Sequence, residues 1–262
     1  MHFSNYAIGT SGFSYDDWIG TFYPTGISKN EMLLFYASHF KTVEINVTYY
    51  TIPSANSFEK MAGKVPAEFE FIVKVNRETT HRRLDNKRAI DQLLEALKPL
   101  KEQQKLAGLL AQFPYSFLNK EQNRSYLLQT KEYTKDEELF VEFRNNSWEN
   151  EAVKNFLESG KIGYVNVDEP ALKGLISTQS WLTTQKGYVR FHGRNKKDWW
   201  EGKGSERYNY NYSNDELQSW LIRISDILKK SYKSYVFFNN HPRGNAPKNA
   251  TTLDEMLKQF IV

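Results

Sequence analysis

The sequence predicts an α/β protein, a TIM-type (β/α)8 barrel formed by a single domain over residues 1–262. Three observations lead to this prediction. Eight short apolar segments read as strands, most of them are followed by a helical pattern, and no Pro- or Gly-rich linker divides the chain. A doubly wound open sheet is the competing architecture, but it gives no reason for the strand ends to be polar.

Each predicted strand is a run of mostly apolar residues that ends close to polar or turn-forming residues. In chain order the runs are 6–10, 42–48, 69–75, 107–113, 138–144, 162–167, 187–192 and 234–239. Several of them alternate, so that one face of the strand carries the polar side chains. In the second run, Glu44 and Asn46 lie on the side opposite to Val43, Ile45 and Val47.

The predicted helices fall between these strands and carry apolar stripes at helical spacing. The first predicted helix begins at Ser28, and the others cover 56–61, 85–101, 120–134, 151–159, 213–230 and 251–260. Ser147 and Ser213 are expected to be N-cap residues, because a serine side chain can accept a hydrogen bond from a free amide of the first turn. Gly160 is expected to end the helix at 151–159.

The strand at 138–144 carries two charges on one face. Glu142 and Arg144 point the same way, and the strand is expected to be buried on both sides in a parallel sheet. A buried carboxylate without a partner costs several kcal/mol, so these side chains need a polar interior. Arg144 lies at the C-terminal end of its strand, where α/β folds carry their chemistry.

Polar residues recur at the other strand ends as well, and in a barrel all of these ends meet at one mouth. We expect this mouth to bind a small anionic ligand. The candidate ligand-binding residues there are Asn46, Lys74, Gln112, Arg144, Asp168, Arg190, Asn239 and Asn240.

Glu44, Glu142 and His192 are the candidate catalytic residues, because proton transfer requires an acid and a base side by side. His192 is favoured as the proton carrier, since an unperturbed histidine has a pKa of about 6.5. His81 is a weaker candidate that lies in a rim cluster of arginines. The alternative is that these charges form a satisfied ion-pair network in a polar layer of the barrel.

The loop after the last strand combines glycine, amides and two cations over residues 239–250. In this fold the loops after strands seven and eight often hold phosphate at a helix N-terminus. Gly244 and Asn249 are therefore predicted to belong to an anion site, with an ordinary capped loop as the alternative.

The segment 193–212 mixes cations with aromatic residues. Its most informative members are Lys196, Lys197, Trp199, Tyr208 and Tyr210. Aromatic rings between cations suit stacking on bases and pairing with phosphates, so nucleic acid is one candidate partner. A lid over a small-molecule pocket is the other interpretation.

No cofactor is predicted. A divalent metal is the less favoured option, and its oxygen-rich site would be formed by Glu44, Glu142, Asp168 and His192. The neighbouring cations Lys74, Arg144 and Arg190 would repel a dication, and no metal-ligand spacing supports it. The chain has no cysteine, which excludes disulfides and thiolate metal sites. A dinucleotide is disfavoured because Gly9 to Gly12 lacks the Gly-x-Gly-x-x-Gly pattern.

The composition leaves the partner open. A net charge of +4 from 35 basic and 31 acidic residues permits a polyanionic partner without requiring one. No leader sequence and no apolar run of membrane-spanning length is found, so a cytoplasmic protein without a membrane partner is expected. The oligomeric state does not follow from the sequence.

Several motifs occur in an order that resembles domain-of-unknown-function family 72, the YecE-like proteins. The matching segments are Gly9-Thr10-Ser11-Gly12-Phe13, Trp18 with Phe22-Tyr23-Pro24, Glu44-Ile45-Asn46, Glu142-Phe143-Arg144 with Ser147-Trp148, Arg190-Phe191-His192-Gly193 and Phe238-Asn239-Asn240. The resemblance spans nearly the whole chain.

This resemblance implies a TIM barrel and carries no established activity. A likeness of the family to endonuclease-IV-type barrels implies nucleic-acid binding or processing as an alternative function. The chain departs from the family pattern at Phe113-Pro114-Tyr115, where a second proline is expected. The favoured function is acid/base chemistry, namely hydrolysis, elimination or isomerisation, on a small phosphorylated or carboxylated substrate. A non-catalytic ligand-binding barrel is the third option.

Overall fold

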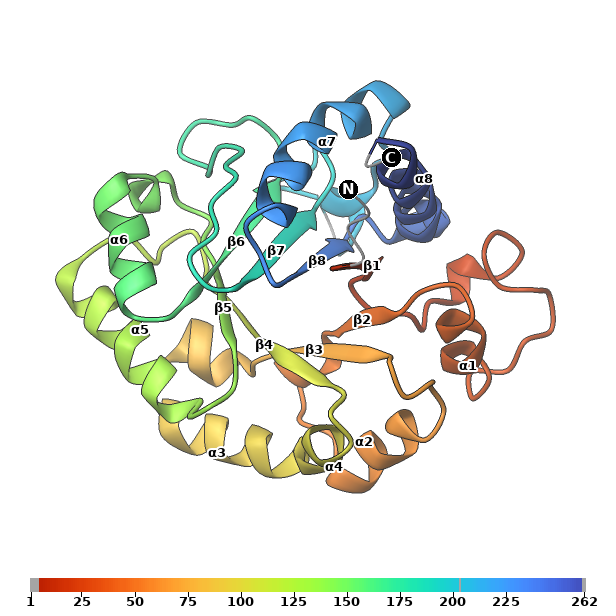
Figure 1. Ribbon diagram of the computed structural model, residues 1–262, viewed down its shortest axis with the longest axis horizontal. Coiled ribbons are helices and arrows are strands. Elements are labelled where there is room, and N and C mark those ends of the chain that lie inside the picture. The colour runs from red at the N-terminus through yellow and green to blue at the C-terminus, as the bar shows by residue number, and fades with distance from the viewer. Residues whose placement is uncertain (1–4, 203, 261–262) are drawn as a thin grey trace.

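Eight parallel strands form a nearly closed barrel in the computed structural model, which describes residues 5–202 and 204–260. The strands follow the order β1-β8-β7-β6-β5-β4-β3-β2, and the helices lie around them (Figure 1). Their bounds are β1 Tyr6–Thr10, β2 Thr42–Ile45, β3 Glu70–Lys74, β4 Leu106–Gln112, β5 Leu139–Glu142, β6 Gly163–Asp168, β7 Lys186–Phe191 and β8 Lys233–Phe238. The predicted TIM-type barrel is confirmed. Residues 1–4, which bear on the expected absence of a leader, lie outside the described residues.

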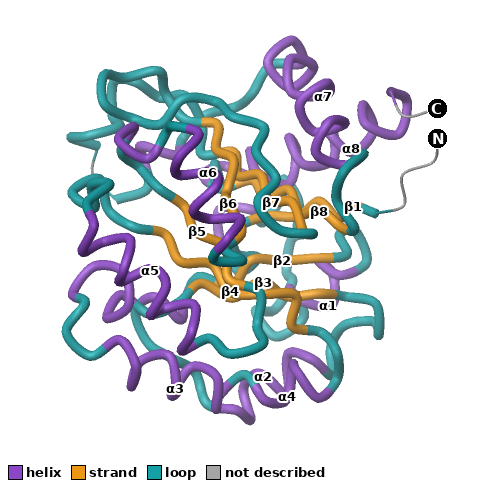
Figure 2. Tube along the Cα trace, turned by 60° about the vertical axis from the view of Figure 1, so that its left-hand side comes forward, coloured by secondary structure: helices purple, strands orange, loops and turns teal. Residues whose placement is uncertain are grey.

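The helices lie outside the strands in both views of the chain (Figures 1 and 2). Their bounds are α1 Met32–Ala37, α2 Ala55–Ala62, α3 Asn86–Ala96, α4 Lys98–Glu102, α5 Glu121–Tyr133, α6 Glu151–Ser159, α7 Asn214–Leu228 and α8 Asn245–Phe260. The single helix predicted over 85–101 is divided in two, because Pro99 has no N–H to continue the hydrogen-bond ladder. Within the described residues, no helix is both long and apolar enough to cross a membrane.

The helix caps are partly those predicted. Ser213 caps α7 in a capping box, since its hydroxyl accepts from the Glu216 amide and the Glu216 carboxylate accepts from the Ser213 amide. Ser147 does not cap a long helix, which corrects the prediction. Asn150 caps α6 by accepting from the Val153 amide at 3.0 Å. The error arises because a short 3-10 turn, 146–148, precedes the helix.

The seam between β1 and β2 closes the barrel without a full hydrogen-bond ladder. A side chain at Gly9 would collide with the carbonyl group of Thr42, so only glycine allows this approach. The hydroxyl of Tyr36 accepts from the Thr10 amide at 2.8 Å and donates to the Thr42 carbonyl at 3.1 Å. Ser11 and Glu44 then form a single parallel bridge. This bridge brings Glu44 to the mouth of the barrel.

The register of the strands decides which side chains enter the barrel. Paired residues of neighbouring parallel strands point to the same side, and Gln112 pairs with Glu142. Below this polar layer the interior is aromatic. The Tyr188 ring lies 4.9 Å from Phe140 and 5.3 Å from Phe237, measured between centroids. The apolar packing therefore closes the interior below the polar layer, and ionisable side chains gather at the C-terminal ends of the strands.

Candidate functional site

Four ionisable side chains form what we call the buried charge cluster: Glu44, Glu142, Arg190 and His192. None is more than 1% exposed. The Arg190 guanidinium donates from one nitrogen to Glu44 Oε1 at 2.7 Å and from the other to Glu142 Oε2. The Tyr188 hydroxyl donates to the second oxygen of Glu44. Each carboxylate is thus paired with a cation inside the barrel, as a buried carboxylate must be.

His192 is held in one neutral form. The amide nitrogen of Asn239 lies 3.0 Å from Nδ1 and can only donate, so Nδ1 accepts and the ring proton is on Nε2, 3.1 Å from Glu142 Oε1. Burial and then the Arg144 charge lower the pKa of His192 to about 3, although Glu142 opposes the shift. The ordinary histidine pKa on which the choice of His192 as proton carrier rested therefore does not apply here, because no solvent reaches the ring to stabilise its charge.

Arg144 extends the network toward the rim. Its guanidinium donates to Glu142 Oε1 at 2.9 Å and to Glu169 Oε2 at 2.6 Å, and it lies 5.5 Å from the Trp199 ring centroid. Burial raises the pKa of Glu169 to about 8 against the opposing Arg144 charge. Glu169 Oε1 has no hydrogen-bond partner among the described residues. The sequence reasoning missed Glu169.

Asp168 does not belong to this network, which corrects its predicted placement. In β6 the preceding Val167 pairs with Arg190 and shares its inward side, so Asp168 points outward toward α7. Its carboxylate accepts hydrogen bonds from Arg194, Tyr212 and Trp220. These contacts anchor the segment after β7 to α7 and leave no free oxygen aimed at the mouth.

The side chains at the ends of β2, β3 and β4 remain partly exposed, and we call them the Lys74 group: Asn46, Tyr49, Lys74 and Gln112. Lys74 Nζ donates to Gln112 Oε1 at 2.8 Å and lies 4.8 Å from the centroid of the Tyr49 ring. Asn46 Nδ2 donates to Glu44 Oε1 at 2.9 Å, which joins this group to the buried charge cluster. Lys74 is thus partly exposed beside the buried charge cluster.

The environment of Lys74 disfavours its charged form. Burial of the side chain and then the Arg190 charge lower the pKa of Lys74 to about 8, with a further contribution from Arg144. Glu44 and Glu142 act in the opposite direction. His81 also lies nearby, edge-on to Tyr49 with centroids 5.1 Å apart. Burial and then the Lys74 charge lower the pKa of His81 to about 4, so it is neutral at physiological pH.

The anion site predicted in the last loop is closed by the chain itself. Helix α8 begins at Asn245, six residues before the predicted start at 251. The Arg243 amide donates to the carboxylate of Asp17 at 2.7 Å, and a side chain at Gly244 would collide with Thr21. The loop after β1 therefore packs over this turn, and Asp17 supplies the negative charge there.

Asn240 and Asn249 also face away from the mouth. Asn239 enters the barrel, and alternation along the chain turns Asn240 outward. Asn240 Nδ2 donates to Asn249 Oδ1 at 2.8 Å, and the same oxygen accepts from the Tyr212 amide at 3.1 Å. The two asparagines thus join α8 to the end of segment 193–212.

Segment 193–212 lies over the buried charge cluster. Trp199 is 3% exposed, and the centroid of the Tyr208 ring lies 6.0 Å from that of His192. The Tyr210 hydroxyl donates to Glu216 at 2.6 Å. The two lysines of the segment, Lys196 and Lys197, are exposed. Trp199 and Tyr208, which were predicted to contact a ligand, face His192 and the barrel mouth. The described part of the segment therefore has the geometry of a cover over the mouth.

Comparison with known proteins assigns the family. The sequence profile described as "Protein of unknown function DUF72" matches residues 7–261. The chain belongs to the DUF72 family. This confirms the resemblance found from the sequence motifs.

Three relatives of this DUF72 protein are similar over nearly their full length. The UPF0759 protein YunF of Bacillus subtilis is 33% identical, with 95% of this chain and 94% of the relative aligned. The crystal structure of a DUF72 family protein from Thermotoga maritima has 40% identity and a TM-score of 0.91, covering 97% and 99% of the two chains. A DUF72 family protein from Enterococcus faecalis has 28% identity and a TM-score of 0.86, covering 96% and 95%.

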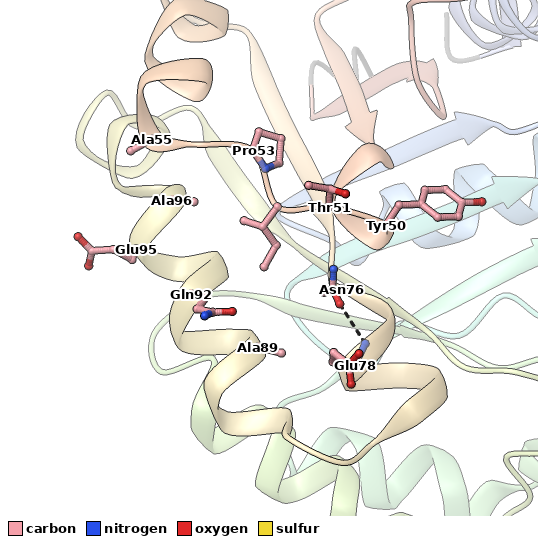
Figure 3. Close-up of a pocket in the computed structure, with 11 residues that line it drawn as sticks. Tyr50, Thr51, Pro53, Ala55, Asn76, Glu78, Ala89, Gln92, Glu95 and Ala96 are labelled. Atoms are coloured by element: carbon pink, nitrogen blue, oxygen red, sulfur yellow. Dashed lines mark hydrogen bonds between the residues drawn. The ribbon is translucent and has the colours of Figure 1, made fainter.

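A surface hollow of about 550 Å³ lies beside the Lys74 group in this DUF72 protein. Figure 3 shows it between the connection 50–55 and α3, with Asn76 and Glu78 at one end. Asn76 follows Lys74 by two residues, and the Tyr50 ring packs edge-on against Tyr49. The lining includes two glutamates and no basic residue, which disfavours an anion in this hollow.

Metal ligands do not cluster in the part of the chain that the structure describes. Over residues 5–202 and 204–260, no group of three or more His, Asp or Glu side chains is placed to hold an ion. The proposed ligands Glu44 and Glu142 are occupied by Arg190, and Asp168 faces α7.

Proposed function

We propose that this DUF72 protein is an enzyme that carries out acid/base chemistry on a small phosphorylated or carboxylated substrate bound over the Lys74 group. One observation carries the proposal. Lys74 is partly exposed at the end of β3, beside the buried charge cluster, and its amine faces an amide oxygen instead of a carboxylate. An amine in this setting can both attract an anion and exchange a proton near neutral pH.

The charge balance at the mouth supports an anionic substrate. Three cations, Lys74, Arg144 and Arg190, surround two carboxylates, Glu44 and Glu142. The third carboxyl group, Glu169, has a pKa of about 8 and is mostly neutral at pH 7. Three positive charges against two negative ones leave one positive charge in excess, in surroundings that screen it weakly.

The geometry favours roles for Glu44, Glu142 and His192 that differ from the catalytic roles predicted for them. Lys74 is the group that contacts the substrate and moves a proton. Glu44 and Glu142 fix the Arg190 guanidinium, and His192 orients Glu142 through a hydrogen bond of 3.1 Å. These three are positioning residues in the proposal, because each is buried and already paired. Hydrolysis, elimination and isomerisation are all compatible with proton transfer at Lys74.

Calorimetric titration with inorganic phosphate and with malonate tests the proposal. Lys74→Met should weaken binding of the better anion by at least about tenfold, which corresponds to about 1.4 kcal/mol. Lys60→Met removes an exposed lysine from α2 and is the matched control, with unchanged affinity expected. Equal affinities in the wild type and Lys74→Met, or the absence of binding by either anion, would contradict the proposal.

Nucleic-acid binding stays as the alternative function, and the exposed Lys196 and Lys197 are the observation in its favour. A titration with single-stranded DNA at several salt concentrations separates the two functions. Affinity that falls steeply with salt and drops in Lys196→Ala/Lys197→Ala would favour the alternative. Binding of a small anion at the Lys74 group should not respond to this double substitution.

A further inference from the structure

Lys74 differs from the lysines that form ion pairs in this protein. Lys87, Lys98, Lys101 and Lys233 each hold a carboxylate, whereas the Lys74 amine donates to the neutral Gln112 side chain. No carboxylate lies within ion-pair distance of Lys74 among the residues that the structure describes. A carboxylate partner would keep an amine protonated, so its absence leaves the nitrogen lone pair available.

Lys105 provides a contrast within the same barrel. Lys105 is buried, and burial lowers its pKa as it does that of Lys74. Its amine, however, donates to the backbone carbonyls of Ala62 and Val65, at the end of the barrel opposite to the mouth. Lys74 combines an amine without a carboxylate partner with a partly exposed position in a cationic mouth. Lys74 therefore differs from Lys105 in its partial exposure and in the group that accepts its hydrogen bond.

We infer that Lys74 is a covalent nucleophile that forms an imine with an aldehyde or ketone carbon of the anionic substrate. The inference rests on the proposed function and narrows its substrate class to carbonyl compounds that carry a carboxylate or phosphate. The Tyr49 ring and Gln112 hold the Lys74 amine at the mouth, and the nearby charges of Arg190 and Arg144 favour an anionic group beside it.

The step balances without an oxidant or reductant. The neutral Lys74 amine adds to the carbonyl carbon, and the carbonyl oxygen takes up a proton to give a carbinolamine. One of the two amine protons is lost from nitrogen in forming the carbinolamine. The nitrogen lone pair then forms the C=N bond while the protonated hydroxyl leaves as water, and the resulting protonated imine can lose its last N–H proton, so that one C=N bond replaces one C=O bond. An imine acidifies the adjacent carbon. This favours elimination and isomerisation over hydrolysis among the proposed reactions.

Reductive trapping with glyoxylate and cyanoborohydride tests the inference on the full chain. Glyoxylate carries an aldehyde beside a carboxylate, and peptide mapping by mass spectrometry locates the reduced adduct. We expect at least tenfold more adduct on Lys74 than on Lys60 or Lys105. Trapping at Lys74 should reach half of its maximal rate near pH 8, whereas an exposed lysine requires a pH of about 10.

Two controls separate a specific site from a reactive surface. Lys74→Arg should lose the adduct while its circular dichroism spectrum stays unchanged, because arginine keeps the charge and cannot form the imine. Propionaldehyde, which has no anionic group, should label Lys74 more slowly than glyoxylate does. Labelling spread evenly over the lysines would overturn the inference.

The outcomes also separate this inference from the proposed function. If phosphate or malonate binds through Lys74 and no adduct forms there, imine formation is wrong and anion binding stands. If neither anion binds and no adduct forms, both are wrong.

Discussion

The barrel mouth has two parts that use the same kinds of side chain in different ways. In the buried charge cluster, both carboxylates, Arg190 and His192 are paired with one another or with neighbouring polar groups and shielded from solvent. In the Lys74 group, the amine donates to an amide oxygen and lies over an aromatic face, and the residue is partly exposed. The first part is held by its own contacts. The second is the part that we propose binds a ligand.

This difference indicates where a reaction can take place. A buried ion pair is a poor reactant, because moving either partner exposes an uncompensated charge to a medium of low dielectric constant. Its use is to fix positions and to set the electrostatic potential. A partly exposed amine beside that potential has a lowered pKa, and perturbed pKa values are common at reactive sites. Three substitutions test whether the two parts really differ.

Arg190→Met should produce the largest loss of stability. It leaves Glu44 and Glu142 buried without their shared cation, and removing one partner of a buried pair typically costs about 3–5 kcal/mol. Urea denaturation at pH 7 measures the free energy of unfolding. A loss below about 1 kcal/mol would show that the cluster is not held by these ion pairs, and the contrast with the Lys74 group would disappear.

His192→Asn should change how stability depends on pH. The unfolded chain binds a proton at His192 below about pH 6.5, whereas the native chain does so only near pH 3. The contribution of neutral His192 to the free energy of unfolding is therefore complete above pH 6.5. It falls as the pH drops, by up to about 1.4 kcal/mol per pH unit. The stability difference between the wild type and the variant should narrow from pH 6.5 to pH 4. A difference that is constant with pH would mean that His192 is not buried in its neutral form.

Lys74→Met should have the smallest effect and the opposite sign. The unfolded chain holds the lysine proton up to about pH 10.4, but the native chain releases it above about pH 8, so the charged amine opposes folding at pH 7. Linkage alone gives the variant a gain of about 3 kcal/mol at pH 7. Loss of the hydrogen bond to Gln112 and of the contact with Tyr49 offsets part of it, so a net gain of about 1 kcal/mol is expected, which should fall as the pH rises toward 10. Thermal unfolding across this pH range measures the change. Destabilisation at pH 7 would assign Lys74 a structural role like that of Arg190.

Strand alternation predicted much of the candidate site. Glu44, Glu142, Arg190 and His192 were expected at one mouth, and the structure brings them together because residues two apart on a strand share a face. The phase of β6 was misjudged, since a parallel strand is apolar on both sides and offers no polar face to mark the interior. Asp168 was therefore chosen in place of Glu169.

The barrel, most of its elements and the gathering of charges at one end could be predicted from the amino-acid sequence. These follow from local periodicity and from the cost of burying an unpaired charge, and both can be read along the chain. Only the tertiary structure decided which of those charges remain accessible. Solvent access and the pKa of a side chain depend on neighbours from distant strands, as when Gln112 of β4 and Arg190 of β7 set the state of Lys74 on β3. No local pattern encodes that arrangement.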